Sequence, residues 1–442
     1  MSPSRPDTDT IYAPATAAGR AAIAIIRVSG PESRPALQSL IGSLPPPRVA
    51  RHVRVRDPET GETIDDALAL WFPAPRSVTG EDVAELHLHG SRAVIAASMA
   101  LLGRLGLRLA EPGEFTRRAF LNGKLDLTQA EAVADLAAAE TEAQRRQALR
   151  QLEGGLGLLY RGWSERLLRL LAHLEAAIDF PDEDLPPEIE ARVAAESAGL
   201  LAEIDAHLAD NRRGERLRDG IAVAIVGPPN AGKSSLLNQL ARREAAITSP
   251  IAGTTRDIIE VAMDLAGYPV VLADTAGLRD SADVIEQEGL RRALARAEAA
   301  ELRLFVFHAG QPEDAEGVAA WPGLDTILVA NKIDLARSGE RLPPGALAIS
   351  ALTGKGLPNL IETVTARIAE RYDIAAPLLT RARHREALET AAAALRRSLA
   401  AGLPELRAED LRLAWRSLGR ITGRVDVEDL LDVIFADFCL GK

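Results

Sequence analysis

The sequence predicts a multidomain chain with an N-terminal α+β domain, an all-α helical domain, and an α/β domain inserted into the helical one. Residues 219–376 alternate short apolar strands with helices, as a doubly wound α/β domain does. Residues 127–218 read as long amphipathic helices without strands, and helical patterns return from 379. One helical domain interrupted by the α/β domain is the simpler interpretation, and two separate small bundles are the alternative.

Composition bounds the kind of protein. The 442 residues suggest roughly three domains at usual domain sizes, and 47% hydrophobic content is ample for several cores. No apolar run reaches the ~18 residues of a membrane span, the first residues lack a signal-peptide pattern, and the single cysteine excludes an internal disulfide. We therefore expect a cytoplasmic protein without membrane contact. The net charge of −11 means that any RNA binding needs local basic patches.

The elements follow in order along four segments. We expect the α+β domain at 1–124, the helical domain at 125–217 and 377–442, and the α/β domain at 218–376. Alternating or β-branched runs predict N-terminal strands at 21–28, 66–72 and 81–89, followed by a helix at 91–105. Helices are expected at 128–152, 156–178, 189–208, 379–399, 408–418 and 426–438, and the acidic break at 180–187 is typical of a solvated loop.

A phosphate-binding loop begins the α/β domain. Gly227-Pro-Pro-Asn-Ala-Gly-Lys-Ser234 matches G-x-x-x-x-G-K-[ST] and lies between the predicted strand 221–226 and a predicted helix. Its two glycines allow the backbone to bend around phosphates, so that the N–H groups and the helix N-terminus face the anion. Lys233 would reach the outer phosphates and Ser234 would bind Mg²⁺.

Four further motifs occur in the order of a guanine-nucleotide switch, each after a predicted strand except the first. Thr255 in Gly253-Thr-Thr-Arg-Asp257 is a second Mg²⁺ ligand, and Asp334 in Asn331-Lys-Ile-Asp334 can accept from both guanine donors. Asp274-Thr-Ala-Gly277 and Ser350-Ala-Leu352 complete the set. The residues expected to bind GTP are Asn230, Ala231, Gly232, Lys233, Ser234, Ser235, Ser249, Thr255, Asp274, Thr275, Ala276, Gly277, Asn331, Lys332, Asp334, Ser350 and Ala351.

The hydrolytic machinery differs from that of Ras-like switches. Those proteins orient the attacking water with a glutamine after the Asp-x-x-Gly glycine, and this chain has Leu278 there. Chemistry alone leaves Asp280, Asp283, Glu286 and Glu288 open as replacements, or all four as solvated charges. No arginine finger is evident, so a second cation could offset the charge that builds between the phosphates.

Further motifs connect the whole chain to one family. They are Arg27-Val-Ser-Gly30, Thr79-Gly-Glu-Asp82, Pro112-Gly-Glu-Phe-Thr116, Phe120-Leu-Asn-Gly-Lys-Leu-Asp126, Phe180-Pro-Asp-Glu-Asp184 and the terminal Cys439-Leu-Gly-Lys442. With the nucleotide motifs, these make the chain resemble, end to end, the MnmE (TrmE) family of tRNA uridine-modification GTPases. The C-terminal Cys-x-Gly-Lys is the most specific signal.

The resemblance implies a folate-binding N-terminal domain, a homodimer, and a heterotetramer with the FAD-dependent protein MnmG (GidA), which alone carries FAD. Together the two proteins would add a carboxymethylaminomethyl or aminomethyl group to carbon 5 of the wobble uridine in certain tRNAs. The one-carbon unit would come from 5-formyl- or 5,10-methylene-tetrahydrofolate. A rival from another class is a ribosome-assembly switch, which would need neither the folate-like domain nor residues 439–442.

The resemblance also implies roles for single residues. Potassium-dependent pairing of two GTPase domains would drive hydrolysis, with Asn230, Ser249, Ile251 and Thr254 as K⁺ ligands, although Pro250 departs from the usual loop. The water-positioning glutamate falls on Glu286. Folate contacts fall on Arg27, Glu85, Lys124 and Lys442.

Two features of the sequence, the single cysteine and the basic clusters, each allow two interpretations. Cys439 is either a small buried apolar group or part of the reaction centre, as a nucleophile or pocket residue, and Lys442 could lower its pKa. The basic clusters 212–218 and 381–385 either contact RNA phosphates or are solvated faces.

Overall fold

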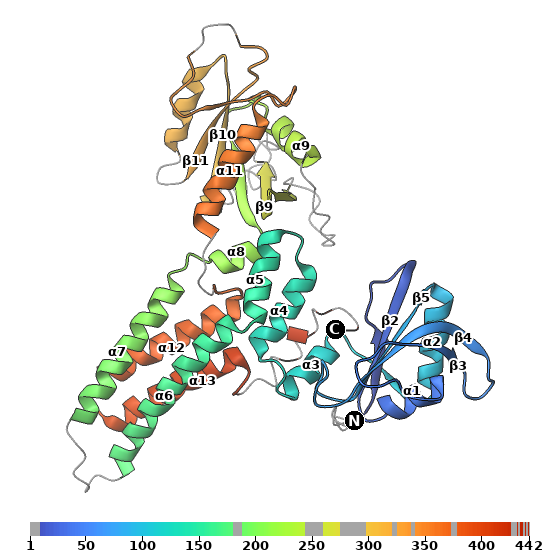
Figure 1. The fold of residues 1–442 in the computed structure, drawn as a ribbon. Coiled ribbons are helices and arrows are strands. Elements are labelled where there is room, and N and C mark those ends of the chain that lie inside the picture. The colour runs from blue at the N-terminus through green and yellow to red at the C-terminus, as the bar shows by residue number, and fades with distance from the viewer. Residues whose placement is uncertain are drawn as a thin grey trace, which may run out of the picture. The chain divides into compact units, whose positions relative to one another are not determined.

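The computed structural model describes residues 9–179, 188–243, 260–274, 298–320, 325–336, 341–372 and 378–425, with residues 431, 434, 435, 438 and 441 (Figure 1). Its internal contacts divide the chain into two compact units. Unit 1 comprises Met1–Ala134, Gln151–Glu190 and Ala400–Lys442. Unit 2 comprises Asp135–Arg150 and Ala191–Leu399.

Unit 1 begins with a six-stranded sheet in the order β3-β4-β5-β2-β1-β6. The strands are β1 Ile11–Pro14, β2 Ala21–Ser29, β3 Arg51–Arg56, β4 Thr63–Phe72, β5 Val83–Gly90 and β6 Arg108–Leu109. All neighbours pair antiparallel except β1 and β6. Helices α1 Ser33–Ile41 and α2 Arg92–Arg104 bury their leucines against Ile26, Leu86 and Leu88 on one face. The opposite face carries alternate residues that stay partly exposed, including Arg27 and Glu85.

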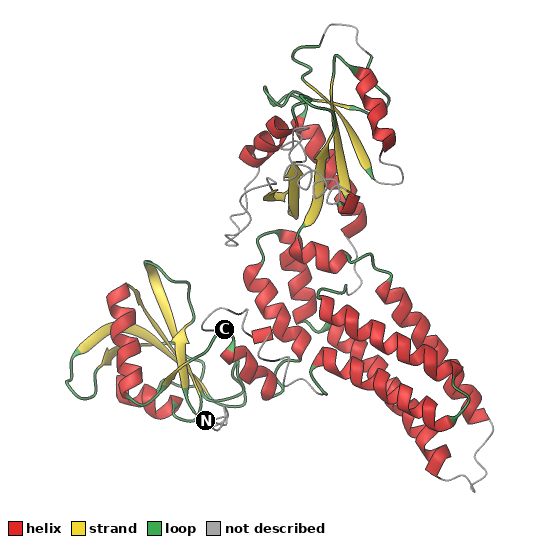
Figure 2. Ribbon diagram, turned by 180° about the vertical axis from the view of Figure 1, so that it is seen from behind, coloured by secondary structure: helices red, strands yellow, loops and turns green. Residues whose placement is uncertain are grey.

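The helices of unit 1 come from both sides of the α/β segment. They are α3 Glu114–Leu121, α4 Leu127–Ala138, α6 Gly155–Asp179 and α13 Pro404–Thr422. Helix α6 precedes the α/β segment and α13 follows it, yet the two pack side by side along their lengths (Figure 1, Figure 2). Arg412 of α13 also donates to Glu175 of α6 at 2.6 Å. The predicted insertion of an α/β domain into a helical one is therefore confirmed, and two separate bundles are excluded.

The single helix predicted at 128–152 is wrong, because two helices occupy that stretch. Helix α4 ends at Ala138 and α5 spans Glu142–Leu152. A capping box starts the second helix: the Thr141 N–H donates to Gln144 Oε1 at 3.1 Å, and the Gln144 N–H donates to Thr141 Oγ1 at 3.4 Å. The break comes from capping, since neither glycine nor proline is present there.

Unit 2 contains the second six-stranded sheet, in the order β12-β11-β10-β7-β9-β8. Its strands are β7 Ile221–Val226, β8 Glu260–Leu265, β9 Tyr268–Asp274, β10 Leu302–His308, β11 Thr326–Asn331 and β12 Leu347–Ala348. Every neighbouring pair is parallel except the β8–β9 hairpin. Helices α9 Lys233–Arg243 and α11 Leu357–Tyr372 cover one face, and the 3₁₀ segment η1 Pro312–Ala320 packs on the other. The predicted α/β domain is present.

Three further helices of unit 2 precede or follow this domain in sequence: α7 Glu188–Leu208, α8 Arg213–Asp219 and α12 Ala382–Ala400. The chain enters the α/β domain through α8 and leaves it just before α12. At Gly214 a Cβ atom would lie 2.1 Å from the Leu379 carbonyl oxygen, so the entering and leaving segments touch through backbone. The inserted domain thus begins and ends at one place.

Candidate functional site

The phosphate loop connects β7 to α9 and needs both of its glycines. Gly227 has φ +138°, and a Cβ there would lie 2.0 Å from the Val306 carbonyl oxygen. Gly232 has φ +91°, and its Cβ would lie 2.3 Å from Asn331 Nδ2. Any side chain at either position would displace backbone or a buried amide. The first turn of α9 therefore presents its N–H groups toward the loop, as an anion site requires.

The lysine of the loop is buried and held by the loop itself. Lys233 Nζ donates to the carbonyl oxygens of Gly227 and Pro228, each at 2.8 Å, and the residue is 6% exposed. The next two residues, Ser234 and Ser235, are exposed in the first turn of α9. A hydroxyl beside a lysine at a helix N-terminus suits Mg²⁺ and phosphate oxygens.

Asn331 joins three of the predicted nucleotide motifs. It ends β11 and is 1% exposed. Its Nδ2 donates to the Ala231 carbonyl at 2.8 Å, and its Oδ1 accepts from the Ala351 N–H at 2.9 Å. One buried amide thus fixes the phosphate loop and the Ser350–Ala351 loop at the same end of the sheet. The sequence names Asn331 as a GTP contact but does not reveal this bridging role.

The remaining described nucleotide residues lie around this amide. Lys332 has φ +63°, and its Nζ donates to the carbonyl of Asn230, which is itself in the left-handed region at φ +58°. Ser350 is fully buried, and its Oγ accepts from the Thr353 N–H at 3.2 Å. Asp334 is exposed, so its carboxylate is accessible to a base.

Several predicted site residues lie outside the described residues. They are Ser249, Ile251, Thr254, Thr255, Thr275, Ala276, Gly277, Leu278, Glu286, Cys439 and Lys442, together with the other acidic candidates Asp280, Asp283 and Glu288 and the side chain of Asp274. Within the described part of the chain, no group of three or more His, Cys, Asp or Glu residues is placed to hold a metal ion. Among the predicted Mg²⁺ and K⁺ ligands, the structure describes Ser234 and Asn230.

The predicted residues of the N-terminal domain form a paired cluster on the open face of the sheet. Arg27 and Glu85 are cross-strand neighbours on β2 and β5, and Arg27 Nε donates to Glu85 Oε1 at 2.9 Å. The Arg27 guanidinium lies 5.7 Å from the ring centre of Phe115, and His87 Nε2 lies 3.4 Å from Glu85 Oε2. A partly exposed carboxylate can accept hydrogen bonds from a planar ligand that donates paired N–H groups. These two partners, Phe115 and His87, are not apparent from sequence.

Lys124 lies on a loop that closes against another motif segment. Its Nζ donates to the Pro75 carbonyl at 3.1 Å. At Gly80, which has φ +84°, a Cβ would lie 3.3 Å from Lys124 Cγ and 3.1 Å from Asn122 Cβ. Asn122 Nδ2 in turn donates to the Thr79 carbonyl at 2.8 Å. The glycine of Thr79-Gly-Glu-Asp82 is therefore needed for this close approach.

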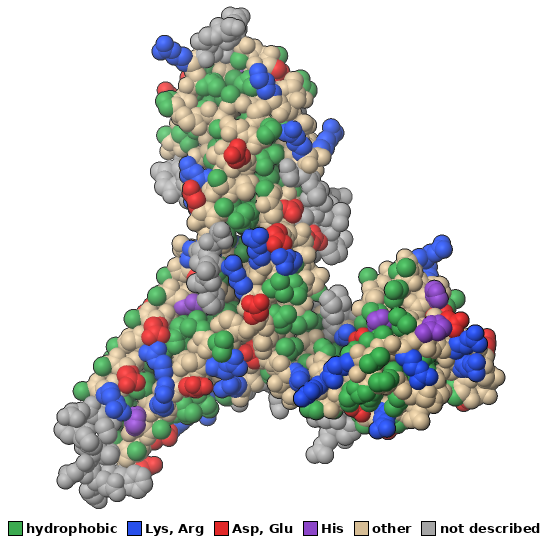
Figure 3. Space-filling view, in the orientation of Figure 1, with side chains coloured by type: hydrophobic (Ala, Val, Ile, Leu, Met, Phe, Trp, Pro, Cys, Tyr) green, Lys and Arg blue, Asp and Glu red, His purple; other side chains and the backbone are tan. Residues whose placement is uncertain are grey.

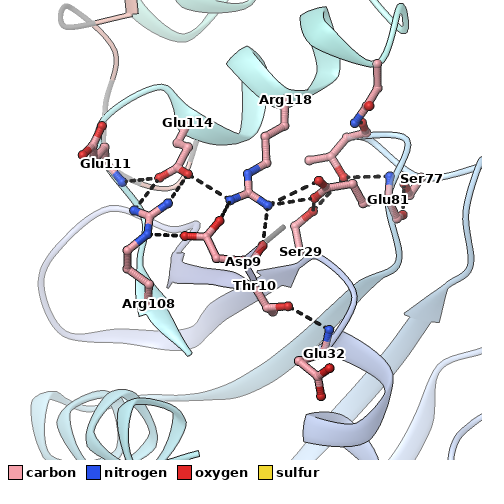
Figure 4. A network of polar contacts seen from close by, with 12 residues as sticks. Asp9, Thr10, Ser29, Glu32, Ser77, Glu81, Arg108, Glu111, Glu114 and Arg118 are labelled. Carbon is pink, nitrogen blue, oxygen red and sulfur yellow. Dashed lines mark hydrogen bonds and ion pairs between the residues drawn. The ribbon is translucent and has the colours of Figure 1, made fainter. Parts of the chain in front are cut away.

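A polar network ties together the segments around this cluster (Figure 4). Arg118 of α3 is 4% exposed and contacts three carboxylates: Asp9 at 2.5 Å, Glu114 at 3.1 Å and Glu81 at 3.2 Å. Arg108 on β6 also donates to Asp9, at 2.6 Å. The network joins the lead-in to β1, the 79–82 loop and α3 and thereby fixes the positions of two motif segments. Sequence reasoning missed it, because the partners are up to 109 residues apart.

The network sets the charge states of its members. Burial raises the pKa of Asp9, but hydrogen bonds from Arg108 and Arg118 outweigh it and hold that pKa below its usual range. For Glu114, burial is likewise outweighed by the hydrogen bond from Arg108, so the pKa is lowered. Burial would lower the pKa of Arg118, but the charge of Glu81 and the hydrogen bond to Glu114 raise it. All three groups are therefore ionised at neutral pH.

Comparison with known proteins gives consistent similarities. Residues 10–124 match a family model described as the GTP-binding protein TrmE N-terminus, and residues 127–439 match one described as the MnmE helical domain. A protein of Parvibaculum lavamentivorans called tRNA modification GTPase MnmE is 60% identical, over 98% of this chain and 100% of its own length. Proteins with the same name from Rhodospirillum rubrum and Paramagnetospirillum magneticum are 58% and 57% identical, each over 98% of this chain and 99% and 100% of their own lengths. Among the described helices, none is long and apolar enough to cross a membrane.

Proposed function

Since the chain belongs to the MnmE family of tRNA modification GTPases, we propose that it hydrolyses GTP in potassium-dependent fashion and modifies the wobble uridine of certain tRNAs. With an FAD-dependent partner it would add a carboxymethylaminomethyl or aminomethyl group at carbon 5. The observation that carries the nucleotide part is the phosphate loop locked by Asn331 to the segment of Ser350 and Ala351. That arrangement supports a phosphate site and a base site at one end of one sheet.

We assign a role to each residue of the nucleotide site from its position in its motif. Lys233 would contact the outer phosphates, and Ser234 with Thr255 would hold Mg²⁺. Asp334 would accept from guanine, which adenine cannot match with a donor pair. Asn230, Ser249, Ile251 and Thr254 would hold K⁺, and Glu286 would orient the attacking water in place of a glutamine at Leu278. The exposed Asp334 and the loop-held Lys233 support this assignment.

The N-terminal cluster would hold the tetrahydrofolate derivative. The carboxylate of Glu85, which lies between Arg27 and His87, would accept the paired N–H groups of the amino-pyrimidinone ring of a folate. Lys124 and Lys442 would complete the contacts, and Cys439 would act at the reaction centre. The bound folate would supply the one-carbon unit, while these residues bind and orient it.

We further propose the assembly and the domain limits. The folate-binding domain spans 1–124, the helical domain 125–217 and 377–442, and the GTPase domain 218–376. The chain works in the cytoplasm as a homodimer and joins the flavoprotein MnmG (GidA) in a heterotetramer that receives tRNA. Membership of the family over nearly the whole chain supports this organisation.

Hydrolysis rates in two salts test the nucleotide mechanism. We expect faster GTP hydrolysis in KCl than in NaCl, because a K⁺ ion offsets charge between the phosphates. Glu286→Ala should abolish hydrolysis in KCl while a fluorescent GTP analogue still binds. Equal rates in the two salts would remove the potassium mechanism, and an active Glu286→Ala variant would remove the assigned role of Glu286.

A calorimetric titration tests the folate part separately. A Lys233→Ala variant, disabled in the nucleotide site, should still bind 5-formyltetrahydrofolate, whereas Glu85→Gln should not. Absence of folate binding by the unaltered chain would contradict the one-carbon role and favour a switch that only binds and releases RNA.

A further inference from the structure

The β8–β9 hairpin of unit 2 connects two of the predicted nucleotide motifs. The motif at residues 253–257 precedes β8 in sequence, and β9 ends at Asp274, the first residue of the next motif. All six residues of β8 pair with β9, and the turn lies at the other end of the hairpin, about 20 Å along the strands. In GTPase switches, contacts of the terminal phosphate and Mg²⁺ order the segments that carry such motifs. A shift at the motif end of a fully paired hairpin is carried to its turn.

The turn of the hairpin has a defined geometry. Its two central residues, Ala266 and Gly267, have φ +49° and +92°. Positive φ at both positions is typical of the tight turns that match the twist of paired strands. The Gly267 N–H also donates to Asp264 Oδ1 at 2.6 Å. The turn is therefore held to its own strands and moves with them.

The same turn contacts the first turn of helix α5. The Gly267 carbonyl accepts from the Ala143 N–H at 2.9 Å, one of the N–H groups that the start of a helix leaves without an intrahelical partner. Ala143 also packs against the core of the α/β domain. Charged side chains of both signs are interspersed over the face seen in Figure 3, whereas this contact joins two uncharged backbone groups. Salt should therefore affect it little.

Two glutamine side chains attach α5 to α8 as well. Gln144 Nε2 donates to the Arg218 carbonyl and Gln147 Nε2 to the Gly214 carbonyl, each at 2.9 Å. Helix α8 leads directly into β7 and the phosphate loop. The side-chain contacts to α8 and the backbone contact to the hairpin are separate, so α5 can stay on α8 while the hairpin turn leaves it.

The other end of α5 belongs to unit 1, which contains its last residues, Gln151 and Leu152. There Gln151 Nε2 donates to the Thr128 carbonyl at 2.7 Å, and Gln129 Nε2 donates to the Leu152 carbonyl at 2.9 Å. Both partners lie in the first turn of α4, a few residues after Lys124. One continuous helix thus leads from the hairpin contact to the segment that carries a proposed folate contact.

We propose that the hydrogen bond between Gly267 and Ala143 is a nucleotide-dependent latch. The hairpin turn docks on α5 in one nucleotide state and leaves it in the other, which couples GTP hydrolysis through α5 to the chemistry of unit 1. The proposal rests on the proposed function, which places GTP hydrolysis and tRNA modification in one chain. A neutral backbone hydrogen bond contributes little net stability, so a difference in phosphate and Mg²⁺ contacts is enough to shift this equilibrium.

A cysteine pair measures the latch directly. A Cβ at Gly267 would lie 3.6 Å from the Cβ of Glu142, a separation at which a disulfide forms. In the full chain with Glu142→Cys and Gly267→Cys, oxidised glutathione should form this disulfide at rates that differ about fivefold or more between GDP and a non-hydrolysable GTP analogue. Each single variant keeps Cys439 and is the control for pairing with that residue. Peptide mass analysis identifies the bond.

The disulfide also acts as a reversible lock. The oxidised double variant should still bind GTP but modify tRNA, with the flavoprotein present, at least about tenfold more slowly than the same variant after reduction with dithiothreitol. Gly267→Asn tests the latch without a disulfide, because asparagine tolerates positive φ but directs a side chain toward Glu142. It should slow modification relative to Gly345→Asn, since Gly345 also has positive φ and a Cβ there would meet nothing within 4 Å.

The possible outcomes separate the latch from the proposed function. Equal rates of disulfide formation in the two nucleotide states would overturn the latch. Full modification by the oxidised double variant, or equal modification by Gly267→Asn and Gly345→Asn, would overturn the coupling through α5. A failure of the unaltered chain to modify tRNA in the presence of the flavoprotein would contradict the proposed function itself. The disulfide rates need only nucleotide binding, so they test the latch in either case.

Discussion

At the residue scale, Asn331 holds the nucleotide site together. Its amide serves the Ala231 carbonyl and the Ala351 N–H, and both of those groups belong to buried residues. An intact hydrogen bond contributes little net stability to the folded state. A buried polar group that is left without its partner, in contrast, destabilises the folded state considerably. The site therefore depends on one side chain that need not touch the base.

We expect Asn331→Ala to lower the free energy of unfolding by roughly 2 kcal/mol, because a buried donor and a buried acceptor lose their partner. Nucleotide affinity should fall as the two loops separate. Urea unfolding without nucleotide and calorimetric titration of GDP measure the two effects. Asn238→Ala, at an exposed position of α9, is the control. If Asn331→Ala changed affinity but not stability, the bridging role would be wrong.

The network around Arg118 makes a prediction about pH. The pKa values of Asp9 and Glu114 are lowered in the folded chain, so the unfolded chain binds more protons as the pH falls. Their stabilisation is present at neutral pH and is lost as the pH drops below about 4.5 through the folded pKa values. Arg118→Gln should cost roughly 2 kcal/mol at pH 7, since Glu81 loses its guanidinium partner and Asp9 and Glu114 keep only Arg108.

The difference between the unaltered chain and Arg118→Gln should shrink as the pH falls through the lowered pKa values of Asp9 and Glu114, because these carboxylates then become neutral. Unfolding midpoints in urea across that range measure it. Arg76→Gln removes an exposed cation of the same unit and should show no such pH dependence. A constant difference from pH 7 to the acid end would mean that the network does not set these charge states.

At the element scale, helix α6 shows how packing depends on one position. At Gly157 a Cβ would lie 2.1 Å from Asp126 Oδ2, and Asp126 caps α4 through its Oδ1, which accepts from the Gln129 N–H at 3.0 Å. At Gly162 of the same helix a Cβ would meet nothing within 4 Å. Gly157 allows α6 to approach the capping residue of α4 closely. Gly162, in contrast, has open space where a side chain would lie.

We expect Gly157→Ala to destabilise the chain by about 1–3 kcal/mol, because the methyl group displaces the capping carboxylate. Gly162→Ala should instead stabilise it by about 0.5–1 kcal/mol, since alanine costs less backbone entropy in a helix. Thermal unfolding of the two variants measures the opposite signs. Equal effects would show that α6 does not approach α4 as described.

The elements also show what sequence can and cannot predict. Periodicity places β2, β5, α2 and α6 within about two residues, because their apolar faces are buried in the predicted sense. The prediction is wrong at Thr141, because a capping box starts a new helix there although the composition predicts one continuous helix. The local apolar pattern predicts where strands and helices lie. The start of a new helix within a helical pattern depends instead on the reciprocal hydrogen bonds of a single capping residue.

At the scale of the whole molecule, motif order predicts the α/β domain, and the return of helical pattern predicts its insertion. The phosphate loop, β7 and the glycines follow from local spacing, which is why they can be read from sequence. The Arg27–Phe115 contact and the Arg118 network cannot, because chain topology brings residues far apart in sequence together. The same reason hides the pairing of Arg218 and Arg381 with Asp135.

In the function proposed above, GTP hydrolysis by this chain serves modification of a wobble uridine. Mass analysis of tRNA from a bacterial strain that lacks its own family member, complemented with this chain, tests it most directly. The unaltered chain should restore the mass of a carboxymethylaminomethyl or aminomethyl group on the wobble uridine, and Glu286→Ala should leave that uridine unmodified at equal protein level. An unmodified uridine with the unaltered, GTP-hydrolysing chain and its flavoprotein partner present would contradict the account.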